Sequence, residues 1–335
     1  MNNNSIFTKS KKEKNDEFYT RLEDIEKELR YYENQFKDKV VLCNCDDPYK
    51  SNFFKYFLLN FKKLGLKKLI STCYNGCEDI PLFDDDTKVV RKAYKAVISI
   101  DKLEDINEDD ILSVLSQDDV ITELKGNGSF DSPECIKLLK ECDIVCTNPP
   151  FSLFRKFIDT IMTYDKKFLV LGTISSITYK SVFPLIKNNK MWLGMTPANG
   201  MYFYVPNEYK HVSTYNSETI KDGRKVIRVP AICWFTNLKT IKRNNPLNLT
   251  KIYKGNESYY PKYDDYDAIN VDKVDDIPED YDGVIGVPVT FLDKYCPQQF
   301  KIVGMVSPSK IDEYNLGYSM INGKYIYARL LIQKI

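Results

Sequence analysis

The chain has 335 residues, of which 43% are hydrophobic and 28% charged, and its formal net charge is +1. These values are ordinary for a soluble globular protein with one large domain and a smaller one, and they exclude nucleic-acid binding driven by overall charge, so any basic surface must be local. No apolar run is long enough to span a membrane and the polar start is no secretory signal, which predicts a cytoplasmic protein with no membrane partner.

Residues 1–14 are polar and are expected to form a flexible tail. The segment 15–36 predicts an extended entry followed by a helix, because apolar residues recur there at helical spacing. Runs rich in valine, isoleucine and leucine predict strands at 39–45, 67–75, 95–100, 143–148, 167–174 and 191–195. Amphipathic or capped segments predict helices at 51–65, 132–142, 152–165 and 182–189.

Strands and helices thus alternate over about 190 residues, which predicts an α/β fold with a doubly wound, mostly parallel sheet. The alternation of strands and helices then ends. Residues 213–235 predict an antiparallel hairpin around the Asp222-Gly223 turn, appended to that sheet. From residue 239 the pattern is less regular, and 263–282 is strongly acidic. We therefore expect one domain over 15–238 and a second lobe over 239–335.

Cysteine and histidine give little sign of a metal or of nucleophilic catalysis. The nine cysteines lie mostly in apolar runs, which suggests buried reduced thiols. Cys43 and Cys45 with Cys73 and Cys77 could be imagined as a zinc site, but their spacings are not the usual ones, and we predict no metal. His211, the single histidine, sits among polar and charged residues and is expected to be exposed.

Ligands of open parallel sheets bind outside the carboxyl ends of the strands, and here those ends carry unusual residues. "CNCDDPYKSN" follows the first strand, "STCYNG" ends the second, "KGNGSF" precedes a later helix, and "TNPPF" ends the fourth. Short polar residues, glycines and prolines therefore gather where a site is expected.

The stretch "TNPPF" predicts a specific chemistry. The Asn148 side-chain oxygen is a hydrogen-bond acceptor, and the Pro149 carbonyl is a second one whose direction the rigid ring fixes. Two neighbouring acceptors match an amine with two hydrogens and aim the nitrogen lone pair at an electrophile. Phe151 offers a face on which a planar heterocycle can stack, so the motif predicts a holder for an amine on an aromatic ring.

The tetrad Asn148–Phe151 resembles the catalytic signature of amino-methyltransferases that use S-adenosylmethionine. Longer stretches narrow the resemblance to the EcoRI-type adenine-specific DNA methyltransferases, and it runs from about Asp16 to the end of the chain. These stretches are "DEFYT", "LCNCDDPYKSNFFKYF", "SPECIKLLKECDIVCTNPPFSLFRKFI" and "GVIGVPVTFLDKYCPQQFKIVG". The resemblance implies a Rossmann-like methyltransferase domain over 15–238 and a DNA target-recognition lobe over 239–335.

The resemblance implies that Asn148 and Pro149 hold the amino group of adenine, that Pro150 sets the turn and that Phe151 stacks on the base. The adenine must be flipped out, because its amine is otherwise paired and stacked in the duplex. The implied function is site-specific methylation of adenine in DNA, either within a restriction–modification system or by an orphan or phage methylase. Double-stranded DNA is the expected partner. A cognate restriction endonuclease that acts on the same site is a second candidate partner, without a stable complex between the two enzymes.

S-adenosyl-L-methionine is the implied cofactor, and its candidate residues come from four segments of the chain. They are Phe18, Tyr19, Thr20, Asn44, Asp46, Asp47, Thr72, Asn127 and Phe130. The carboxylates of Asp46 and Asp47 would meet the ammonium of its methionine part. The chain departs from the general methyltransferase pattern in two places: the loop after the first strand has no glycine, and Thr72 stands where an acidic residue for the ribose is expected.

Basic residues on and after the hairpin are candidates for DNA phosphates. They are Lys221, Arg224, Lys225, Arg228, Lys239, Lys242 and Arg243. Each group of site residues also has a purely structural interpretation: Asn-Pro-Pro can end a strand, Asp46 and Asp47 can form a turn, Phe18 and Tyr19 can pack in the core, and the hairpin can simply be exposed.

Two other functions stay open at this point. The same tetrad would serve a methyltransferase acting on RNA adenine or on protein glutamine, although a glutamine enzyme would have no need of a long recognition lobe. The atypical cofactor loop would also fit a non-catalytic nucleic-acid-binding protein on a methyltransferase scaffold, whereas the intact tetrad argues for catalysis.

Overall fold

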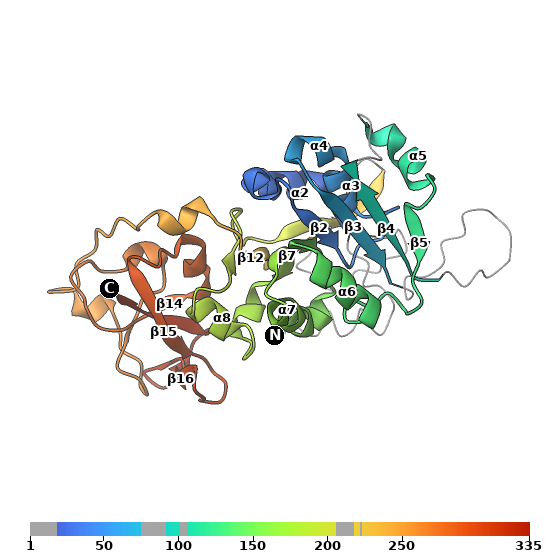
Figure 1. Ribbon diagram of the computed structural model, residues 1–335. Helices are drawn as coiled ribbons and strands as arrows, with labels where there is room; N and C mark the ends of the chain where they lie inside the picture. The colour runs from blue at the N-terminus through green and yellow to red at the C-terminus, as the bar shows by residue number, and fades with distance from the viewer. Residues whose placement is uncertain (1–18, 75–91, 101–105, 206–217, 222) are drawn as a thin grey trace. The chain divides into compact units, whose positions relative to one another are not determined.

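The computed structural model describes residues 19–74, 92–100, 106–205, 218–221 and 223–335, and the candidates Phe18, Cys77 and His211 lie outside these ranges. The chain divides into two compact units. The first comprises residues 1–173 and 199–238, and the second comprises 174–198 and 239–335. The elements are labelled along the chain in Figure 1.

The first unit is built on a mixed sheet whose strands run in the order β5-β4-β3-β2-β6-β7-β12. Their bounds are β2 (Val40–Cys43), β3 (Lys68–Cys73), β4 (Tyr94–Ser99), β5 (Ile121–Glu123), β6 (Ile144–Thr147), β7 (Lys167–Thr173) and β12 (Ile232–Thr236). Only the four central strands, β3-β2-β6-β7, are mutually parallel, whereas β4, β5 and β12 pair antiparallel with their neighbours. The α/β fold is thus confirmed, with parallel pairing limited to the centre of the sheet.

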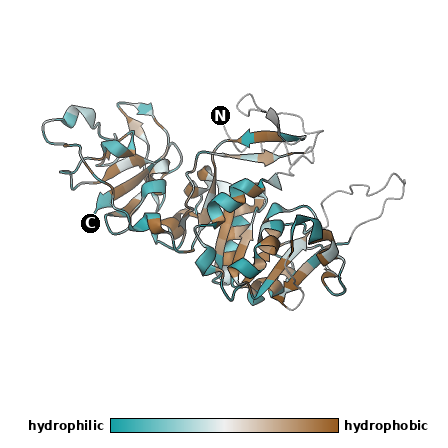
Figure 2. Ribbon diagram, turned by 90° about the horizontal axis from the view of Figure 1, so that it is seen from above, coloured by the Kyte–Doolittle hydropathy of each residue, from teal (hydrophilic) through white to brown (hydrophobic). Residues whose placement is uncertain are grey.

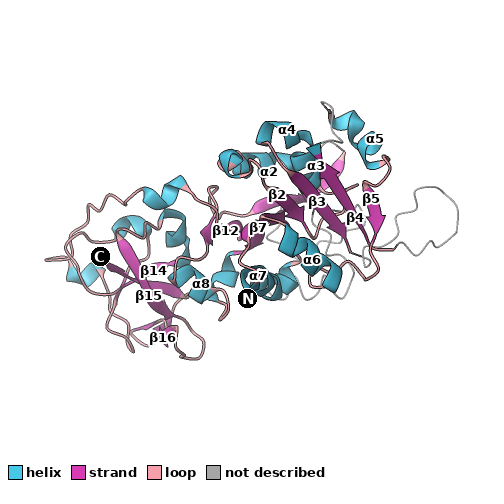
Figure 3. Ribbon diagram, in the orientation of Figure 1, coloured by secondary structure: helices cyan, strands magenta, loops and turns pink. Residues whose placement is uncertain are grey.

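Helices cover both faces of this sheet. Figure 1 shows α2, α3 and α4 on one side and α6 and α7 on the other, and Figure 3 sets them against the strands. Their bounds are α2 (Leu22–Leu29), α3 (Asn52–Leu59), α4 (Phe61–Leu64), α5 (Ile111–Leu115), α6 (Pro133–Glu141) and α7 (Phe154–Thr163). Layers on both faces explain why β2 and β6 are buried throughout and read as apolar runs. Figure 2 shows hydrophobic strands of the sheets in brown.

Local sequence explains where these helices begin and end. The Ser51 hydroxyl accepts a hydrogen bond from the Phe53 amide at 3.0 Å and caps α3. Ser132 caps α6, and Pro133 occupies its first turn, where a missing N–H costs nothing. The helix predicted over 51–65 is divided into α3 and α4, and Gly65 ends α4 with a left-handed φ of 62°.

The expected antiparallel hairpin forms, but it is not appended to the main sheet. β10 (Glu218–Lys221) pairs with β11 (Arg224–Val229), and β11 pairs with β9 (Met201–Tyr204), which pairs with β1 (Tyr19–Thr20). These strands make a separate sheet in the order β1-β9-β11-β10. The main sheet instead receives β12, which the Pro230-Ala231 turn separates from β11; Ala231 has a φ of 63°.

The second unit is centred on a sheet in the order β13-β14-β19-β15-β16. Its strands are β13 (Ile269–Asn270), β14 (Ile285–Pro288), β15 (Phe300–Val306), β16 (Asn315–Gly317) and β19 (Arg329–Lys334), and β17 (Met320–Ile321) with β18 (Lys324–Tyr325) forms a separate hairpin. Phe291 packs against Phe300 at a ring separation of 5.5 Å in its core. Residues 174–198 add α8 (Phe183–Lys187) and the short β8 (Trp192–Leu193).

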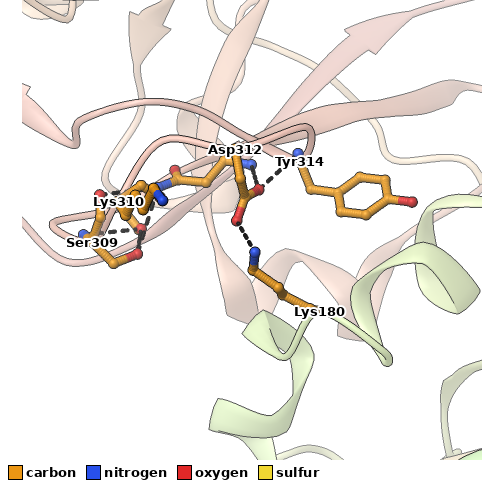
Figure 4. A network of polar contacts seen from close by, with 7 residues as sticks. Lys180, Ser309, Lys310, Asp312 and Tyr314 are labelled. Carbon is orange, nitrogen blue, oxygen red and sulfur yellow. Dashed lines mark hydrogen bonds and ion pairs between the residues drawn. The ribbon is translucent and has the colours of Figure 1, made fainter.

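Residues 174–198 are fastened to the rest of the second unit by side chains. Phe183 lies 5.7 Å from the Tyr314 ring, and Lys180 forms an ion pair with Asp312 at 3.3 Å. Asp312 also accepts hydrogen bonds from the Tyr314 and Asn315 amides, as Figure 4 shows for Tyr314. Across the residues that the structure describes, every helix is too short or too polar to traverse a bilayer.

Candidate active site

The centre of the main sheet contains a point where its winding changes direction. From β2 the chain continues to β3 on one side, while β6 lies against the other side of β2 and leads on to β7. The loops that leave the carboxyl ends of β2 and β6 therefore diverge, and such a crevice is where open α/β sheets bind ligands. These two loops are 44–51 and 148–151, the two stretches that carry the acidic pair and the tetrad.

A buried carboxylate joins the two loops. Asp46 is only 6% exposed, and its two oxygens accept hydrogen bonds from different elements. Oδ1 accepts from the Ser51 hydroxyl at 2.6 Å, and Oδ2 accepts from the hydroxyl of Thr147, the last residue of β6. The Ser71 hydroxyl on β3 donates to the Asp46 backbone carbonyl, so three neighbouring elements fix this residue.

Burial raises the pKa of Asp46 to about 6, and the neighbouring Asp47 acts in the same direction. The hydroxyls of Ser51 and Thr147 oppose the shift, because both donate to the ionised carboxylate. The thiols of Cys43 and Cys146 are fully buried below the loops, and burial raises the pKa of each well above its usual range. They are therefore inert neutral groups in the core.

Asp47 is held differently from Asp46. Its Oδ1 accepts hydrogen bonds from the Tyr94 hydroxyl at 2.7 Å and from the Tyr49 amide at 2.9 Å. Its Oδ2 accepts none from the described residues, and the residue is half-buried. Asp47 thus presents one carboxylate oxygen that a positively charged group could bind.

The tetrad leaves the sheet directly after Thr147. Asn148 and Phe151 are half-buried, Pro149 is buried and Pro150 is exposed. The proline ring fixes φ at about −65°, and Pro150 has φ −56° and ψ 120°, so the backbone is extended there before Phe151 begins a short 3-10 helix, η4 (Phe151–Leu153). The four residues therefore lie at the edge of the core, on a rigid exit from the sheet.

A phenylalanine that sequence reasoning missed supports the tetrad. Phe203 of β9 is fully buried, and its ring centroid lies 6.5 Å from that of Phe151, with the rings nearly perpendicular. Phe203 pairs with Thr20 of β1, and the Thr20 carbonyl accepts a hydrogen bond from the Asn52 side chain at 2.7 Å. The small sheet thereby places Tyr19 and Thr20 next to the start of α3. The sequence "MYFYV" could have been recognised as a strand, but not as the neighbour of residues 19–20.

The loop 125–130 reaches the same edge of the sheet through a glycine. Gly128 has a φ of 73°, and a Cβ there would come within 2.4 Å of the Cys73 carbonyl oxygen at the end of β3. Phe130 is buried and packs against Phe157 at 5.0 Å, whereas Asn127 is exposed and its Oδ1 accepts from the Ser129 amide. The structure thus gives Phe130 a core contact and Asn127 a turn contact.

Three of the candidate cofactor residues are buried and polar. Thr20, Asn44 and Thr72 are each 5% exposed or less. Thr20 Oγ1 and Asn44 Oδ1 have no hydrogen-bond partner among the described residues, while Thr72 lies near the Cys135 thiol and acts on its pKa. Buried polar atoms are usually paired, so the oxygens of Thr20 and Asn44 are groups that a ligand could satisfy.

The basic residues of the hairpin do not form one patch. The β9–β11 register places Arg228 opposite Tyr202 and Lys225 on the alternate face with Phe203. Arg224 is exposed, and its guanidinium lies 4.7 Å from the centre of the Tyr204 ring, on the face that carries Tyr202. Arg224 and Arg228 therefore share an aromatic face, and Lys225 projects from the other. The Lys221 backbone pairs with Arg224, and its side chain lies outside the described residues.

Lys242 and Arg243 are engaged inside the second unit. Arg243 lies 4.3 Å from the centre of the Trp192 ring and 5.4 Å from that of Tyr295, and it donates to the Asn189 side chain at 2.6 Å. Burial lowers the pKa of Arg243, although its guanidinium remains charged at neutral pH. Lys242 pairs with Asp293 at 3.4 Å.

Comparisons with known proteins identify the family. The family model described as "Adenine-specific methyltransferase EcoRI" matches residues 6–334. Type II methyltransferase M.EcoRI of Escherichia coli is 46% identical over 331 residues, which cover 98% of this chain and 96% of that protein. M.MgeORF184P of Mycoplasma genitalium is 38% identical, with 98% of each chain covered. M.MpnI of Mycoplasma pneumoniae is 41% identical over 89% of this chain and 84% of its own.

No solved structure matches this chain. The family match nevertheless covers both units, including the β2 loop, the tetrad after β6 and the whole of 239–334. It agrees with the resemblance that the sequence motifs indicate. The chain therefore belongs to the family of the adenine-specific methyltransferase EcoRI.

Proposed function

We propose that this protein transfers a methyl group from S-adenosylmethionine to the exocyclic amine of an adenine in double-stranded DNA, at a specific sequence. The observation that carries the proposal is the position of the tetrad in a chain of this family. Asn148 to Phe151 follow β6 at the point where the sheet changes its winding, beside the acidic loop after β2. A ligand bound there would meet both loops.

The residues around the acidic loop fit S-adenosylmethionine. When bound, this cofactor supplies an activated methyl group on a sulfonium. The buried oxygens of Thr20 and Asn44 offer hydrogen-bond partners, and Asp47 Oδ2 offers a carboxylate oxygen to the cofactor's ammonium. Asp46 is less suited to that role, because Thr147 and Ser51 already donate to its two oxygens. Tyr19, Thr72, Asn127 and Phe130 are further cofactor residues under this proposal.

The tetrad holds the adenine. The Asn148 amide oxygen and the Pro149 carbonyl accept hydrogen bonds from the two N–H groups of the amine, which directs the nitrogen lone pair toward the methyl donor. Phe151 stacks on the base, and Phe203 keeps the Phe151 ring in place from its edge. The new N–C bond forms as the S–C bond breaks, and the resulting ammonium releases one proton to the solvent. Positioning and exclusion of water do most of the work, because the base needs no deprotonation before attack.

The two units have different roles in DNA binding. The first unit, with Arg224 and Arg228 beside Tyr202 and Tyr204, contacts DNA phosphates, and Lys221 and Lys225 are further candidates for phosphate contacts. The second unit reads the target sequence. For Lys242 and Arg243 a phosphate contact competes with their internal partners. The target base leaves the helix to reach the tetrad, since its amine is inaccessible in a paired duplex.

Substitution of Asn148 by alanine tests the proposal. The variant loses one of the two acceptors for the amine, so transfer of a labelled methyl group to duplex DNA should fall by at least roughly 100-fold. Binding of S-adenosylmethionine, measured by titration calorimetry, should stay within a few-fold of wild type. Asn60→Ala is the matched control, because Asn60 is also a half-buried asparagine of the first unit, and its side-chain amide donates to the Tyr56 carbonyl within its own helix segment.

The substrate class is decided by offering duplex DNA, RNA and protein to the wild-type chain in parallel. Methylation of RNA or protein in preference to DNA would contradict the proposal, and so would a normal rate for Asn148→Ala. A wild-type chain that binds no cofactor would instead indicate a non-catalytic binding protein. Sequencing of modified bases in cells that express the chain would identify the target site and show whether it matches that of a restriction endonuclease.

A further inference from the structure

The hydrogen bond between Thr147 and Asp46 links residues that are 101 positions apart in the sequence. Thr147 immediately precedes Asn148, and Asp46 immediately precedes Asp47. One bond therefore connects the backbone that carries the proposed base holder to the backbone that carries the proposed cofactor carboxylate. Both side chains are buried, with Thr147 fully so.

Other hydrogen bonds to Asp46 make its link to Thr147 rigid. Ser51 holds Oδ1 and is itself fixed as the cap of α3, while Ser71 holds the Asp46 carbonyl from β3. Displacement of Asp46 away from Thr147 would disturb its side-chain bond to Ser51 and its backbone bond to Ser71. Movement of the β2 loop would thus be transmitted to the end of β6, and the reverse.

We propose that Thr147 is a positioning residue, which acts through the Asp46 carboxylate to hold the Asn148–Phe151 tetrad in register with the acidic loop. This inference rests on the proposed function, and it gives Asp46 a structural coupling role that differs from ammonium binding. Methyl transfer needs the amine and the methyl donor aligned closely, and a misplacement of about 1 Å can lower the rate by about 100-fold. A bond between the residues that immediately precede Asn148 and Asp47 sets the distance between the two loops.

The coupling also depends on ionisation of Asp46. The ionised carboxylate can accept from both hydroxyls, whereas a protonated carboxyl must place its own hydrogen on one of these bonds. Among the residues that the structure describes, the titratable groups that face Asp46 are Asp47 and the thiols of Cys43 and Cys146. Burial keeps both thiols neutral, so neither thiol changes charge in the weakly acidic range.

Thr147→Val is the principal test. Valine keeps the shape of threonine and removes the donor to Asp46. We expect the single-turnover rate of methyl transfer to fall roughly 10- to 100-fold, while the dissociation constant for S-adenosylmethionine changes less than about threefold. Thr147→Ser, which restores a hydroxyl, should recover most of the rate.

The pH profile separates coupling from a general loss of packing. Loss of a donor raises the pKa of Asp46 further, so the acidic limb of the single-turnover rate should move to higher pH by on the order of one unit in Thr147→Val. Asp46→Asn removes the titrating group, so its profile should lose that limb. Thr236→Val is the matched control: Thr236 is another fully buried threonine of the same sheet, and its hydroxyl donates to the Phe168 carbonyl. That variant should show no shift of the limb.

The outcomes are distinct. The inference is overturned if Thr147→Val keeps the wild-type rate and pH profile, or if Thr147→Ser is as slow as valine with an unmoved acidic limb. A slow Thr147→Val with a shifted limb and a recovered serine variant supports it. A wild-type chain that transfers no methyl to DNA would overturn the proposed function and, with it, the coupling role.

Discussion

Asp46 is a carboxylate that the fold buries at an energetic cost. Desolvation disfavours its charged form, and the nearby Asp47 adds to this effect, so its pKa rises from an ordinary value of 3.8 to about 6. The two hydroxyl donors offset only part of the cost. A buried carboxylate of this kind is weak evidence for stability, and a role in positioning the site explains why it is present.

This burial predicts how stability should respond to pH at Asp46. A raised folded-state pKa means that the protonated form favours folding, so the contribution of Asp46 is present below about pH 4 and is lost as the pH rises through about 6. Asp46→Asn does not lose stability in this way, because asparagine does not ionise. Its free energy of unfolding relative to wild type should therefore increase from about pH 4 to about pH 7.5, by at most of the order of 3 kcal/mol. Urea unfolding of both proteins measures the difference, and a constant difference would contradict it.

Two arginines of the predicted DNA surface differ in their surroundings. Arg224 is exposed beside a tyrosine ring, whereas the Arg243 guanidinium lies against the rings of Trp192 and Tyr295. An exposed guanidinium remains available for a phosphate, while a stacked and hydrogen-bonded one contributes mainly to packing. The sequence alone predicts a phosphate contact for both residues, because each belongs to a basic cluster.

Substitution by glutamine should separate these roles. Arg224→Gln should weaken DNA binding for all sequences and reduce the slope of log affinity against log salt by about one. Arg243→Gln should leave that slope unchanged and lower the free energy of unfolding by about 1–2 kcal/mol. DNA titrations at several salt concentrations and chemical denaturation of both variants are the measurements. A smaller slope of log affinity against log salt in Arg243→Gln would instead indicate that Arg243 contacts a DNA phosphate.

Among the elements, the loop 125–130 depends most clearly on one glycine. Gly128 adopts a positive φ and also lies so close to Cys73 and Ala93 that a Cβ would come within 2.9 Å or less of both. The close approach attaches the loop to the carboxyl end of β3. It therefore fixes Asn127 and Phe130 at the edge where the cofactor is proposed to bind.

Gly128→Ala should displace this loop. We expect a loss of roughly 2–4 kcal/mol in unfolding free energy and a weaker affinity for S-adenosylmethionine. Gly223→Ala is the control, because Gly223 has a similar φ of 72° but no atom within 4 Å of a built Cβ. That change should cost only about 1 kcal/mol for the left-handed backbone and leave cofactor affinity unaltered. Equal effects of the two substitutions would contradict a role for the close approach.

The elements that sequence predicts well are those with a strong local signal. β2 and β6 are apolar runs, and α6 begins with a serine cap and a proline, so their positions follow from composition and helix-end chemistry. β1 has two residues and pairs with β9 some 180 positions away, a contact that no periodicity encodes. For the same reason the sequence does not reveal the contact of Phe203 with the tetrad, or that the hairpin joins β9 and not the main sheet.

The bond between Asp46 and Thr147 shows a similar limit at the site. The sequence places both residues at carboxyl ends of strands, and the order of strands in the sheet decides that these ends are neighbours. Sequence order does not determine that β6, and not β4, lies beside β2. The polar residues of the site are therefore recognisable one by one, whereas their contacts depend on topology.

At the level of the whole molecule, the chain enters the second unit twice. Residues 174–198 leave the first unit, join the second, and are followed by a return to the first at 199–238. The sequence suggests a single boundary near residue 239, because from there on the predicted elements follow a less regular pattern. The helix α8 and the strand β8 continue that alternation locally, although they pack with β15 and with η9 (Val289–Lys294) of the second unit.

This division makes the source of target specificity testable by exchange of segments with a relative that modifies a different sequence. If the second unit reads DNA, a chimera that receives both 174–198 and 239–335 should modify the donor's target sequence. Exchange of 239–335 alone should lower the melting temperature, because donor residues would then meet Lys180 and Phe183 in place of Asp312 and Tyr314. Sequencing of modified adenines from cells that express each chimera gives the target. A two-segment chimera that keeps this chain's own target would place recognition in the first unit, with the hairpin as its first candidate.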